Sequence, residues 1–342
     1  KDPVLCFARY PGVIGWDHQQ GRGWCFGNMP SLNTTLSDLP LSAPQIGQVT
    51  VDSAQLHECA ILEALDRIRA GDIYQVNLAR RWQVSYQGDA FPLFLIMREQ
   101  SPVPYGCYLQ TPSCVVLSRS MECFLNWEGP GQKLYTQPIK GTVALNQDAS
   151  IHVQNELRND SKELAEHTMI VDLMRNDLSR ISEPHSVRVL NPYAINLYAK
   201  LCHMVSTVEC VTPSNITLEH VLRATFPPGS ISGAPKHAAI QLIESLEPAA
   251  RGIYTGAIGI VFPDGRAKFS VAIRTAVLRE DILTYWAGGG IVAASQPEKE
   301  LAETELKSKV FVDTLNRLRV GSFRNSLMQS YCSRQDRVTV EG

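Results

Sequence analysis

The stretch QPIKGT (137–142) places one lysine, Lys140, between a proline that stiffens the chain and a glycine that lets it turn. Because most lysines are solvated, the ordinary interpretation is a surface lysine at the end of a strand. The alternative is an amine aimed into a pocket, where loss of hydration lowers its pKa and makes it a nucleophile. Lys140 alone does not decide between the two.

Two charged segments, far apart in the sequence, carry carboxylates on one face of a predicted helix. They are Glu163 and Glu166 in NDSKELAEHTMIVDLMRNDLSRI (159–181), and Glu300, Glu303 and Lys307 in PEKELAETELKSK (297–309). Stripes of this kind are usually solvated helix faces. The alternative is that a carboxylate from each helix holds Mg²⁺, which prefers oxygen ligands and leaves positions open for a substrate. The glycines of the apolar run WAGGGIVAAS (286–295), just before the second segment, allow close backbone approach to a ligand.

Two further features could bind a carboxylate. Arg274 interrupts the apolar run FSVAIRTAVL (269–278), so it lies either on the exposed face of a strand or in a bidentate clamp. In FPPGSISGAPK (226–236), a turn rich in serine and glycine leads into a helix expected to begin at Pro235. Free N–H groups there could meet a carboxylate, or the turn could be a plain helix entry. The spacing argues against a nucleotide-binding loop, because no adjacent Gly-Lys-Ser/Thr is present.

The periodicity of the chain predicts the elements that must position these residues. A helix is expected over 51–70, with Ser53 as its N-cap and Gly71 ending it, followed by a β-prone run over 73–86. A strand meander over 106–142 and one helix over 154–182 follow. The remaining predictions are strands at 186–190, 203–211, 254–262, 267–278 and 282–292, and helices at 217–224, 235–246 and 297–318. Because many strands follow one another directly, an α+β or layered antiparallel architecture is favoured over a doubly wound parallel sheet.

The composition argues against several classes of function. The chain has 342 residues, 44% of them hydrophobic, and a net charge of -2, which gives no support for nucleic acid or an anionic membrane as partner. No apolar run approaches membrane-spanning length. The nine cysteines are scattered and never spaced as CxxC. They indicate reduced thiols in a cytoplasmic protein rather than a zinc site or a disulfide framework.

Eight motifs, in order along the chain, carry a resemblance to a known family. They are GDIYQVNLARR, QPIKGT, ELAEHTMIVDLMRNDLSRI, HMVSTV, FPPGSISGAPK, IYTGAIG, AIRTA and AGGGIVAASQPEKELAETELKSK. The chain resembles the chorismate-utilising enzymes, which include the large subunits of anthranilate synthase and aminodeoxychorismate synthase, isochorismate synthases and salicylate synthases. The resemblance implies an α+β fold of the anthranilate synthase component I type, with two large antiparallel sheets flanked by helices. It also implies chorismate as substrate and Mg²⁺ as cofactor.

The resemblance assigns roles to individual positions of this sequence. Glu166 and Glu303 match the family's magnesium carboxylates, and Glu300 matches an auxiliary ligand acting through water. Arg274 and Tyr254 match side chains that grip a substrate carboxylate.

Further matches surround the expected substrate. Lys307 matches a lysine beside a backbone cradle formed by Gly288, Gly289 and Gly290. His203 and Ser230 match positions that line the ring pocket. Glu122 matches the general acid that protonates the departing 4-hydroxyl group.

Two positions separate the members of the family. Gln75 stands where isochorismate and salicylate synthases have a lysine that activates water, and an uncharged amide cannot serve as that base. Lys140 stands where anthranilate synthases have alanine, as in the aminodeoxychorismate synthase large subunit. There the amine attacks ring carbon 2, and ammonia from a glutaminase subunit then adds at carbon 4. We therefore expect aminodeoxychorismate synthase component I activity, in p-aminobenzoate and folate synthesis, with anthranilate synthase component I as the alternative within the family.

Two departures from the family pattern bear on this expectation. The usual Ser-Pro-Glu around the general acid is SRSMECF here, with Met121 before Glu122, and a Pro-Gly-Gly pattern has become Pro227-Pro228-Gly229. These changes keep a third hypothesis open, a non-catalytic partner subunit that retains the fold.

The resemblance also divides the chain. Residues 1–48 are expected to be a remnant of an N-terminal sheet region with a linker, 49–320 the chorismate-binding catalytic domain, and 321–342 a peripheral tail.

Overall fold

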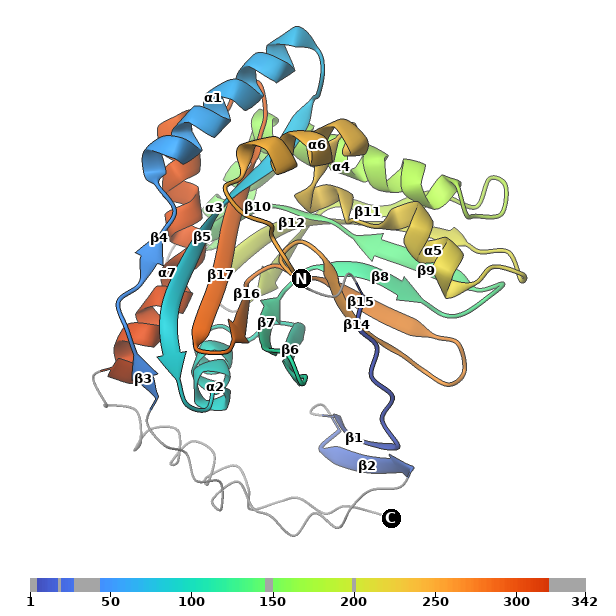
Figure 1. Cartoon of the computed structure of the whole chain (residues 1–342). Coiled ribbons are helices and arrows are strands. Elements are labelled where there is room, and N and C mark those ends of the chain that lie inside the picture. The colour runs from blue at the N-terminus through green and yellow to red at the C-terminus, as the bar shows by residue number, and fades with distance from the viewer. Residues whose placement is uncertain (1–4, 18–19, 28–43, 145–149, 199–200, 320–342) are drawn as a thin grey trace.

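The computed structural model describes residues 5–17, 20–27, 44–144, 150–198 and 201–319. Helices surround two antiparallel sheets in these residues (Figure 1). The helices are α1 (Ala54–Ala70), α2 (Phe91–Gln100), α3 (Ser150–Asn159), α4 (Ser161–Ser179), α5 (Leu218–Thr225), α6 (Lys236–Leu246) and α7 (Pro297–Arg319), with a 3₁₀ turn η2 (Gly229–Ile231). The strands are β1 (Gly12–Asp17), β2 (Arg22–Gly27), β3 (Gln45–Ile46), β4 (Thr50–Val51), β5 (Gln75–Gln87), β6 (Tyr105–Gln110), β7 (Val115–Ser120), β8 (Cys123–Trp127), β9 (Lys133–Gln137), β10 (Ile139–Ala144), β11 (Arg188–Tyr198), β12 (Leu201–Val211), β13 (Gly233–Ala234), β14 (Ala257–Val261), β15 (Ala267–Val271), β16 (Thr275–Arg279) and β17 (Ile282–Ile291).

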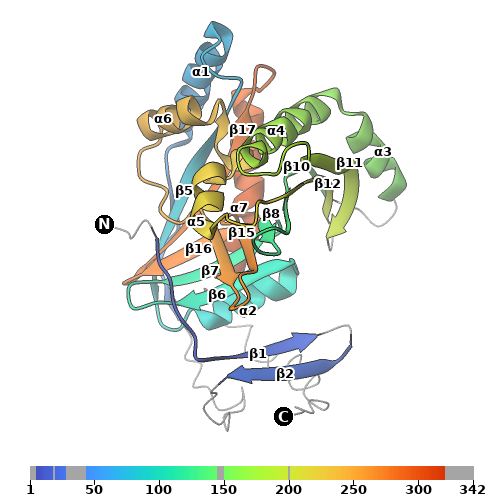
Figure 2. The same cartoon turned by 90° about the vertical axis from the view of Figure 1, so that its right-hand side faces the viewer.

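The two sheets divide the strands between them. Within the described residues, the eight-stranded sheet has the order β13-β5-β17-β16-β7-β6, with β3 and β4 also paired to β5. The seven-stranded sheet has the order β10-β12-β9-β8-β15-β14, with β11 paired to β12. Strands β1 and β2 form a separate hairpin that lies away from both sheets (Figure 2). The predicted α+β fold with two large antiparallel sheets is confirmed.

The helices bury their apolar faces against these sheets. α1 and α6 pack on β5 and β17 through a cluster that includes Ile61, Leu78 and Ile243. α2 and α7 cover the other end of the same sheet. α4 packs on the seven-stranded sheet, where Ile170 meets buried side chains of β8, β9 and β12. The helices that carry the acidic stripes, α4 and α7, are therefore each fixed by a core of their own.

Local signals in the sequence explain the ends of α1. The Ser53 hydroxyl accepts a hydrogen bond from the Leu56 N–H, and Gly71 ends the helix in the left-handed conformation with φ of 84°. Both were predicted. Leu62 of this helix is apolar but 52% exposed.

Three elements differ most from the prediction, and β11 (Arg188–Tyr198) also extends well beyond the strand expected over 186–190. The helix expected over 154–182 is two helices, because the Asp160 carboxylate accepts a hydrogen bond from the Glu163 N–H and caps a new start. The strand expected over 267–278 is β15 and β16, which belong to different sheets. Helix α2 was not predicted, because its sequence FPLFLIMREQ is buried along most of its length and lacks a polar face.

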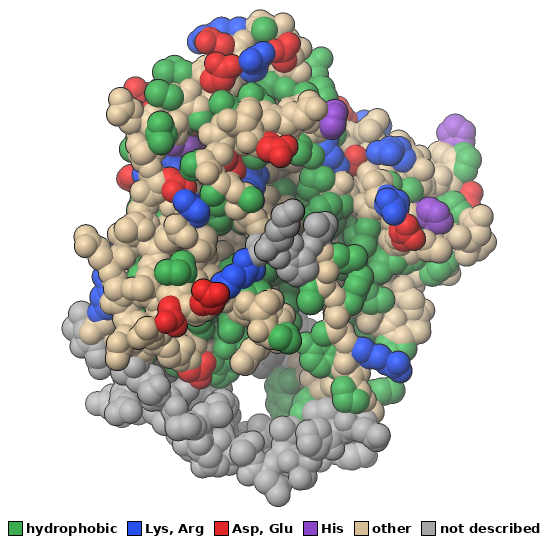
Figure 3. All heavy atoms as spheres, viewed as in Figure 1, with side chains coloured by type: hydrophobic (Ala, Val, Ile, Leu, Met, Phe, Trp, Pro, Cys, Tyr) green, Lys and Arg blue, Asp and Glu red, His purple; other side chains and the backbone are tan. Residues whose placement is uncertain are grey.

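Other predictions have a more limited outcome. The described cysteines are free thiols. Within the described residues, no helix is long and apolar enough to cross a membrane. The proposed tail, 321–342, lies outside the described residues, and the domain boundaries stay a prediction. Acidic and basic side chains are interspersed on the face drawn in Figure 3, including over α1 at its top.

Candidate active site

Lys140 lies in β10, at a bulge that turns its side chain into the protein. Lys140 pairs with Met204 of β12, and the register shifts between Lys140 and the second residue after it. Gly141 forms the bulge with φ of 61°, and a Cβ there would lie 2.5 Å from Leu157 Cδ1, so glycine is required. The Lys140 side chain is 12% exposed, and its Nζ lies 3.7 Å from Glu166 Oε2. The interpretation as a solvated surface lysine is therefore wrong.

The glycines of β17 leave room for two groups of side chains. A Cβ at Gly290 would lie 2.9 Å from Lys140 Nζ and 2.7 Å from Gln75 Nε2. A Cβ at Gly289, the preceding residue, would lie 3.0 Å from Glu300 Oε2. Any larger residue at either position would displace a candidate catalytic or metal-binding side chain, which accounts for consecutive glycines in a buried strand.

Helix α7 is joined to this strand through Lys307. Its Nζ donates a hydrogen bond of 2.8 Å to the Gly288 carbonyl and forms an ion pair with Glu303. The Lys307 carbonyl in turn accepts a hydrogen bond of 2.5 Å from Arg274 Nη1. Arg274 has φ of 51° and lies between β15 and β16, so it is at a corner of the chain rather than on a strand face.

Glu122 lies in the short link between β7 and β8 and is buried. The Ser230 hydroxyl donates a hydrogen bond of 2.5 Å to its Oε1. Burial raises the pKa of Glu122 to about 7, although the Ser230 hydroxyl, the Lys140 charge and the Ile139 N–H each act to lower it. A carboxyl with such a pKa holds a proton near neutral pH, as a general acid must. With methionine at position 121 in place of the family's proline, Glu122 is still buried and hydrogen-bonded to Ser230.

His203 and Tyr254 are both buried. Burial, with the nearby charge of Arg274, lowers the pKa of His203 to about 4, so the ring is neutral at neutral pH. The Tyr254 ring stacks on Trp286 of β17, with centroids 6.0 Å apart. Burial raises the pKa of the Tyr254 phenol, so its hydroxyl stays a hydrogen-bond donor.

Gln75 is fully buried at the start of β5. Within the described part of the chain, neither its amide nitrogen nor its amide oxygen has a hydrogen-bond partner. Buried polar groups are normally paired, so this amide suits a site that a polar ligand completes.

His167, the neighbour of Glu166 in α4, was not among the predicted site residues. Its Nε2 lies 2.6 Å from the Ser206 hydroxyl of β12, and burial, together with the charge of Lys140, lowers its pKa to about 4. The Ser206 hydroxyl also accepts a hydrogen bond from the Tyr193 N–H. The contact ties the helix that carries Glu166 to the strand that pairs with Lys140. The only signal in the sequence was the position of the histidine beside the acidic stripe.

The chain matches the model of the family described as chorismate binding enzyme over residues 1–313. This chain belongs to that family. It is 35% identical, over 90% of its length, to anthranilate synthase component 1 of Saccharolobus solfataricus, of which it covers 72%. It is 39% identical, over 69% of its length, to aminodeoxychorismate synthase component 1 of Salmonella typhimurium, of which it covers 52%. The chain spans about half to three quarters of the length of these relatives.

Solved structures share the fold of this chain. Anthranilate synthase component I from Streptococcus pneumoniae superposes with a TM-score of 0.75 and 28% identity, over 88% of this chain and 72% of that one. MenF, the menaquinone-specific isochorismate synthase from Escherichia coli, superposes with a TM-score of 0.73 and 23% identity, over 82% of this chain and 65% of that one. The second likeness concerns the fold alone. Similar identities to several members do not decide which reaction a chorismate-binding enzyme performs.

The donor chemistry of this chorismate-binding enzyme suits the Mg²⁺ that the resemblance implies. Glu166 on α4 and Glu300 on α7 are buried carboxylates, and Glu303 lies beside Glu300 at Gly289. Within the described residues, however, no three carboxylate, imidazole or thiol groups converge to hold a metal ion. Lys140 and Lys307 instead neutralise two of these carboxylates. The arrangement fits Mg²⁺ held by one or two carboxylates with the remaining positions filled by substrate and water, as is usual for this ion.

Proposed function

We propose that this chain acts as aminodeoxychorismate synthase component I, converting chorismate and ammonia to 4-amino-4-deoxychorismate. The observation that carries the proposal is the amine of Lys140, whose side chain is 12% exposed and lies 3.7 Å from Glu166 Oε2, within electrostatic reach of Glu122. An amine beside a protonated carboxyl supplies a nucleophile and a general acid to one substrate. An anthranilate synthase needs no nucleophilic side chain at that position.

The first step would form a covalent intermediate. The Lys140 amine, in its neutral form, attacks ring carbon 2 as the C4–O bond breaks, and the two conjugated ring double bonds shift from C1=C2 and C5=C6 to C1=C6 and C4=C5. Glu122 gives its proton to the departing hydroxyl, so water leaves, and the attacking amine loses a proton. Gly290 leaves space for the amine, because a Cβ at that residue would lie 2.9 Å from Nζ.

The second step reverses the bonding at carbon 2. Ammonia adds at carbon 4, the C2–N bond to Lys140 breaks, and the amine recovers its proton. The neutral amide of Gln75 cannot deprotonate a water molecule, which favours ammonia over water as the external nucleophile.

The remaining side chains would hold the substrate. Arg274 and Tyr254 would grip one carboxylate, and the backbone of Gly288–Gly290 with Lys307 would support the substrate next to it. His203, neutral at neutral pH, and Ser230 would line the ring pocket.

Mg²⁺ would be held by Glu166 and Glu303, with Glu300 acting through water. When bound, it would neutralise and fix the ring carboxylate of chorismate. Ammonia would come from a glutaminase subunit, and the enzyme would work in the cytoplasm.

Anthranilate synthase component I is the second candidate. Relatives with that name are 35% identical to this chain in Saccharolobus solfataricus and 38% in Thermus thermophilus, close to the values for aminodeoxychorismate synthases. Both reactions begin from chorismate and ammonia, so the product distinguishes them. Anthranilate is formed with pyruvate, whereas 4-amino-4-deoxychorismate retains the pyruvyl group.

The test is to incubate the chain with chorismate, Mg²⁺ and ammonium, and to identify the product by mass. We expect 4-amino-4-deoxychorismate, its loss in Lys140→Ala, and a covalent adduct on Lys140 when ammonium is omitted. Lys133→Ala is the matched control. Lys133 lies on β9, the strand before β10 in the sequence, and its side chain is 57% exposed. Anthranilate plus pyruvate would establish the second candidate. Absence of turnover, with no Mg²⁺-dependent thermal shift, would favour the non-catalytic subunit.

A further inference from the structure

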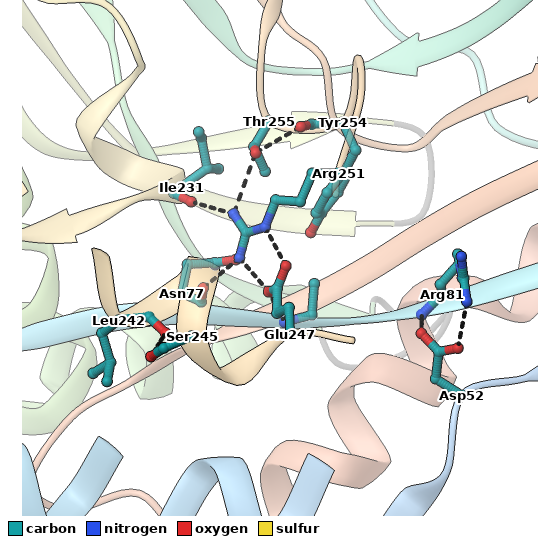
Figure 4. A network of polar contacts seen from close by, with 11 residues as sticks. Asp52, Asn77, Arg81, Ile231, Leu242, Ser245, Glu247, Arg251, Tyr254 and Thr255 are labelled. Atoms are coloured by element: carbon teal, nitrogen blue, oxygen red, sulfur yellow. Dashed lines mark hydrogen bonds and ion pairs between the residues drawn. The ribbon is translucent and has the colours of Figure 1, made fainter. Parts of the chain in front are cut away.

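All five N–H groups of the Arg251 guanidinium are used within the protein (Figure 4). Nε and Nη2 donate to the two carboxylate oxygens of Glu247, at 2.7 and 2.5 Å. Nη2 also donates to the Asn77 carbonyl at 2.6 Å, and Nη1 donates to the Ile231 carbonyl at 3.3 Å and to the Thr255 hydroxyl at 3.2 Å. The Arg251 side chain is 12% exposed and that of Glu247 is 4% exposed, so solvent hardly competes for these bonds.

Three of the four acceptor residues lie within two residues of candidate site residues, and two of these three are distant from Arg251 in the sequence. Asn77 follows Gln75 by two residues in β5. Ile231 follows Ser230 in η2, and the Ser230 hydroxyl donates a hydrogen bond to Glu122, the candidate general acid. Thr255 follows Tyr254. One guanidinium therefore joins the strand, the turn and the corner that carry three different side chains of the site.

The corner at Thr255 needs such support. Thr255 has φ of 65°, in the left-handed region, where a β-branched residue is strained. Conformations of this kind persist only where their surroundings hold them. The Arg251 Nη1 bond to the Thr255 hydroxyl and the Thr255 N–H bond to the Ala272 carbonyl, at 2.9 Å, hold this one.

Arg251 also contacts Tyr254 directly. The guanidinium carbon lies 5.6 Å from the centroid of the Tyr254 ring, which also stacks on Trp286. The position of Tyr254 thus depends on Arg251 in two ways, through the ring and through the strained residue that follows it.

We propose that Arg251 is a positioning residue that aligns Tyr254, Ser230 and the start of β5 for chorismate turnover. Its five donors bond the Glu247 carboxylate, two backbone carbonyls and the Thr255 hydroxyl. The proposal rests on the proposed function only for the identity of the substrate. A plain ion pair would need only the positive charge of Arg251, whereas the proposed role needs the planar arrangement of its five donors.

Arg251→Lys separates geometry from charge. The lysine keeps a cation for the buried carboxylate of Glu247, but it has three donors and cannot reach all four partners at once. Because small misplacements of a site can cost about 100-fold in rate, we expect kcat/KM for chorismate to fall by about that factor, mainly through KM. The protein should stay folded, with a lower melting temperature because buried acceptors lose their donors. Arg223→Lys is the matched control, since Arg223 bonds Glu219 at the same i,i+4 spacing but with its side chain 76% exposed.

A double-variant cycle with Tyr254→Phe gives the decisive readout. If Arg251 acts by placing Tyr254, kcat/KM of the double variant should be no more than about 2-fold lower than that of the worse single variant. Independent losses that multiply would overturn the proposal, as would activity of Arg251→Lys within about 2-fold of the original. If Arg251→Lys does not fold, Arg251→Met combined with Glu247→Gln, which removes both charges, takes its place in the cycle.

Hydrogen exchange tests the same contact without substrate. Exchange should quicken in peptides covering 75–79, 230–232 and 254–256 of Arg251→Lys, and should not change there in Arg223→Lys. Unchanged exchange in all three peptides would overturn the proposal. If the unaltered chain does not turn over chorismate, the proposed function fails, and this measurement still decides the role of Arg251.

Discussion

Replacing Glu122 with glutamine tests the assignment of the general acid through both stability and rate. Glutamine keeps the shape of the side chain and can still accept a hydrogen bond from Ser230, but it cannot deliver a proton. Burial raises the pKa of Glu122 from 4.5 to about 7 in the folded protein. A shift of that size corresponds to about 3 kcal/mol between the two protonation states.

The sign of the effect on stability follows from where the proton is lost. Below pH 4.5 the carboxyl is protonated in both the folded and the unfolded protein. Between pH 4.5 and about 7 the unfolded chain releases the proton while the folded protein keeps it, so the free energy of unfolding falls as the pH rises. Above the folded pKa the loss is complete. Glu122→Gln lacks this loss. Between pH 4.5 and 8, its free energy of unfolding should therefore rise relative to that of the original protein, by up to about 3 kcal/mol.

Thermal unfolding at a series of pH values measures this gain, with Glu128→Gln as the control because Glu128 is exposed. The rate should respond in parallel. Since only the protonated carboxyl can act as the acid, kcat/KM for chorismate should fall as the pH rises above about 7, and Glu122→Gln should be inactive throughout. A melting-temperature difference that stays constant from pH 5 to pH 8 would refute the reasoning, as would turnover by Glu122→Gln.

Gly290→Ala should lower chorismate turnover by about 100-fold with little change in melting temperature, because its Cβ would lie 2.9 Å from Lys140 Nζ; full activity would contradict the close approach. Ser206→Ala should remove the hydrogen bond to His167 and slow adduct formation on Lys140 in an ammonium-free mass assay, and an unchanged rate would show that the contact does not position the site. Gly141→Ala should destabilise the protein by about 1–3 kcal/mol, measured by thermal unfolding, because of its left-handed φ and the clash with a leucine side chain.

The sequence predicted most of the elements, but it missed features created by tertiary contacts. Signals that act within a few residues, such as the Ser53 cap and the Gly71 stop, were found because they need no partner from elsewhere. Helix α2 was missed because a helix buried on most sides has no amphipathic period. The role of Arg251 could not be read from the sequence, since two of its acceptors, the Asn77 and Ile231 carbonyls, come from distant segments that only the fold brings to it.

The prediction of one strand over 267–278 was wrong for a related reason, which also explains where the candidate site lies. β15 belongs to the seven-stranded sheet and β16 to the eight-stranded sheet, so the chain crosses between sheets at Arg274 within an apparently continuous apolar run. Glu122 lies at the equivalent crossing from β7 to β8. The two crossings are joined, because the Val271 N–H donates to the Glu122 carbonyl at 3.1 Å and the Arg119 N–H donates to the Arg274 carbonyl at 3.1 Å.

A strand residue must point to one face of one sheet, whereas a residue at a crossing can point into the space between two sheets. Lys140 reaches that space by a different device, the bulge at Gly141, which breaks the alternation of β10. The candidate acid, the candidate carboxylate clamp and the candidate nucleophile are thus all placed by interruptions of β structure. Insertion of one residue between Glu122 and β8 should therefore abolish turnover more completely than an insertion in the exposed β8–β9 turn at Pro130, and equal activity of the two insertions would contradict this account.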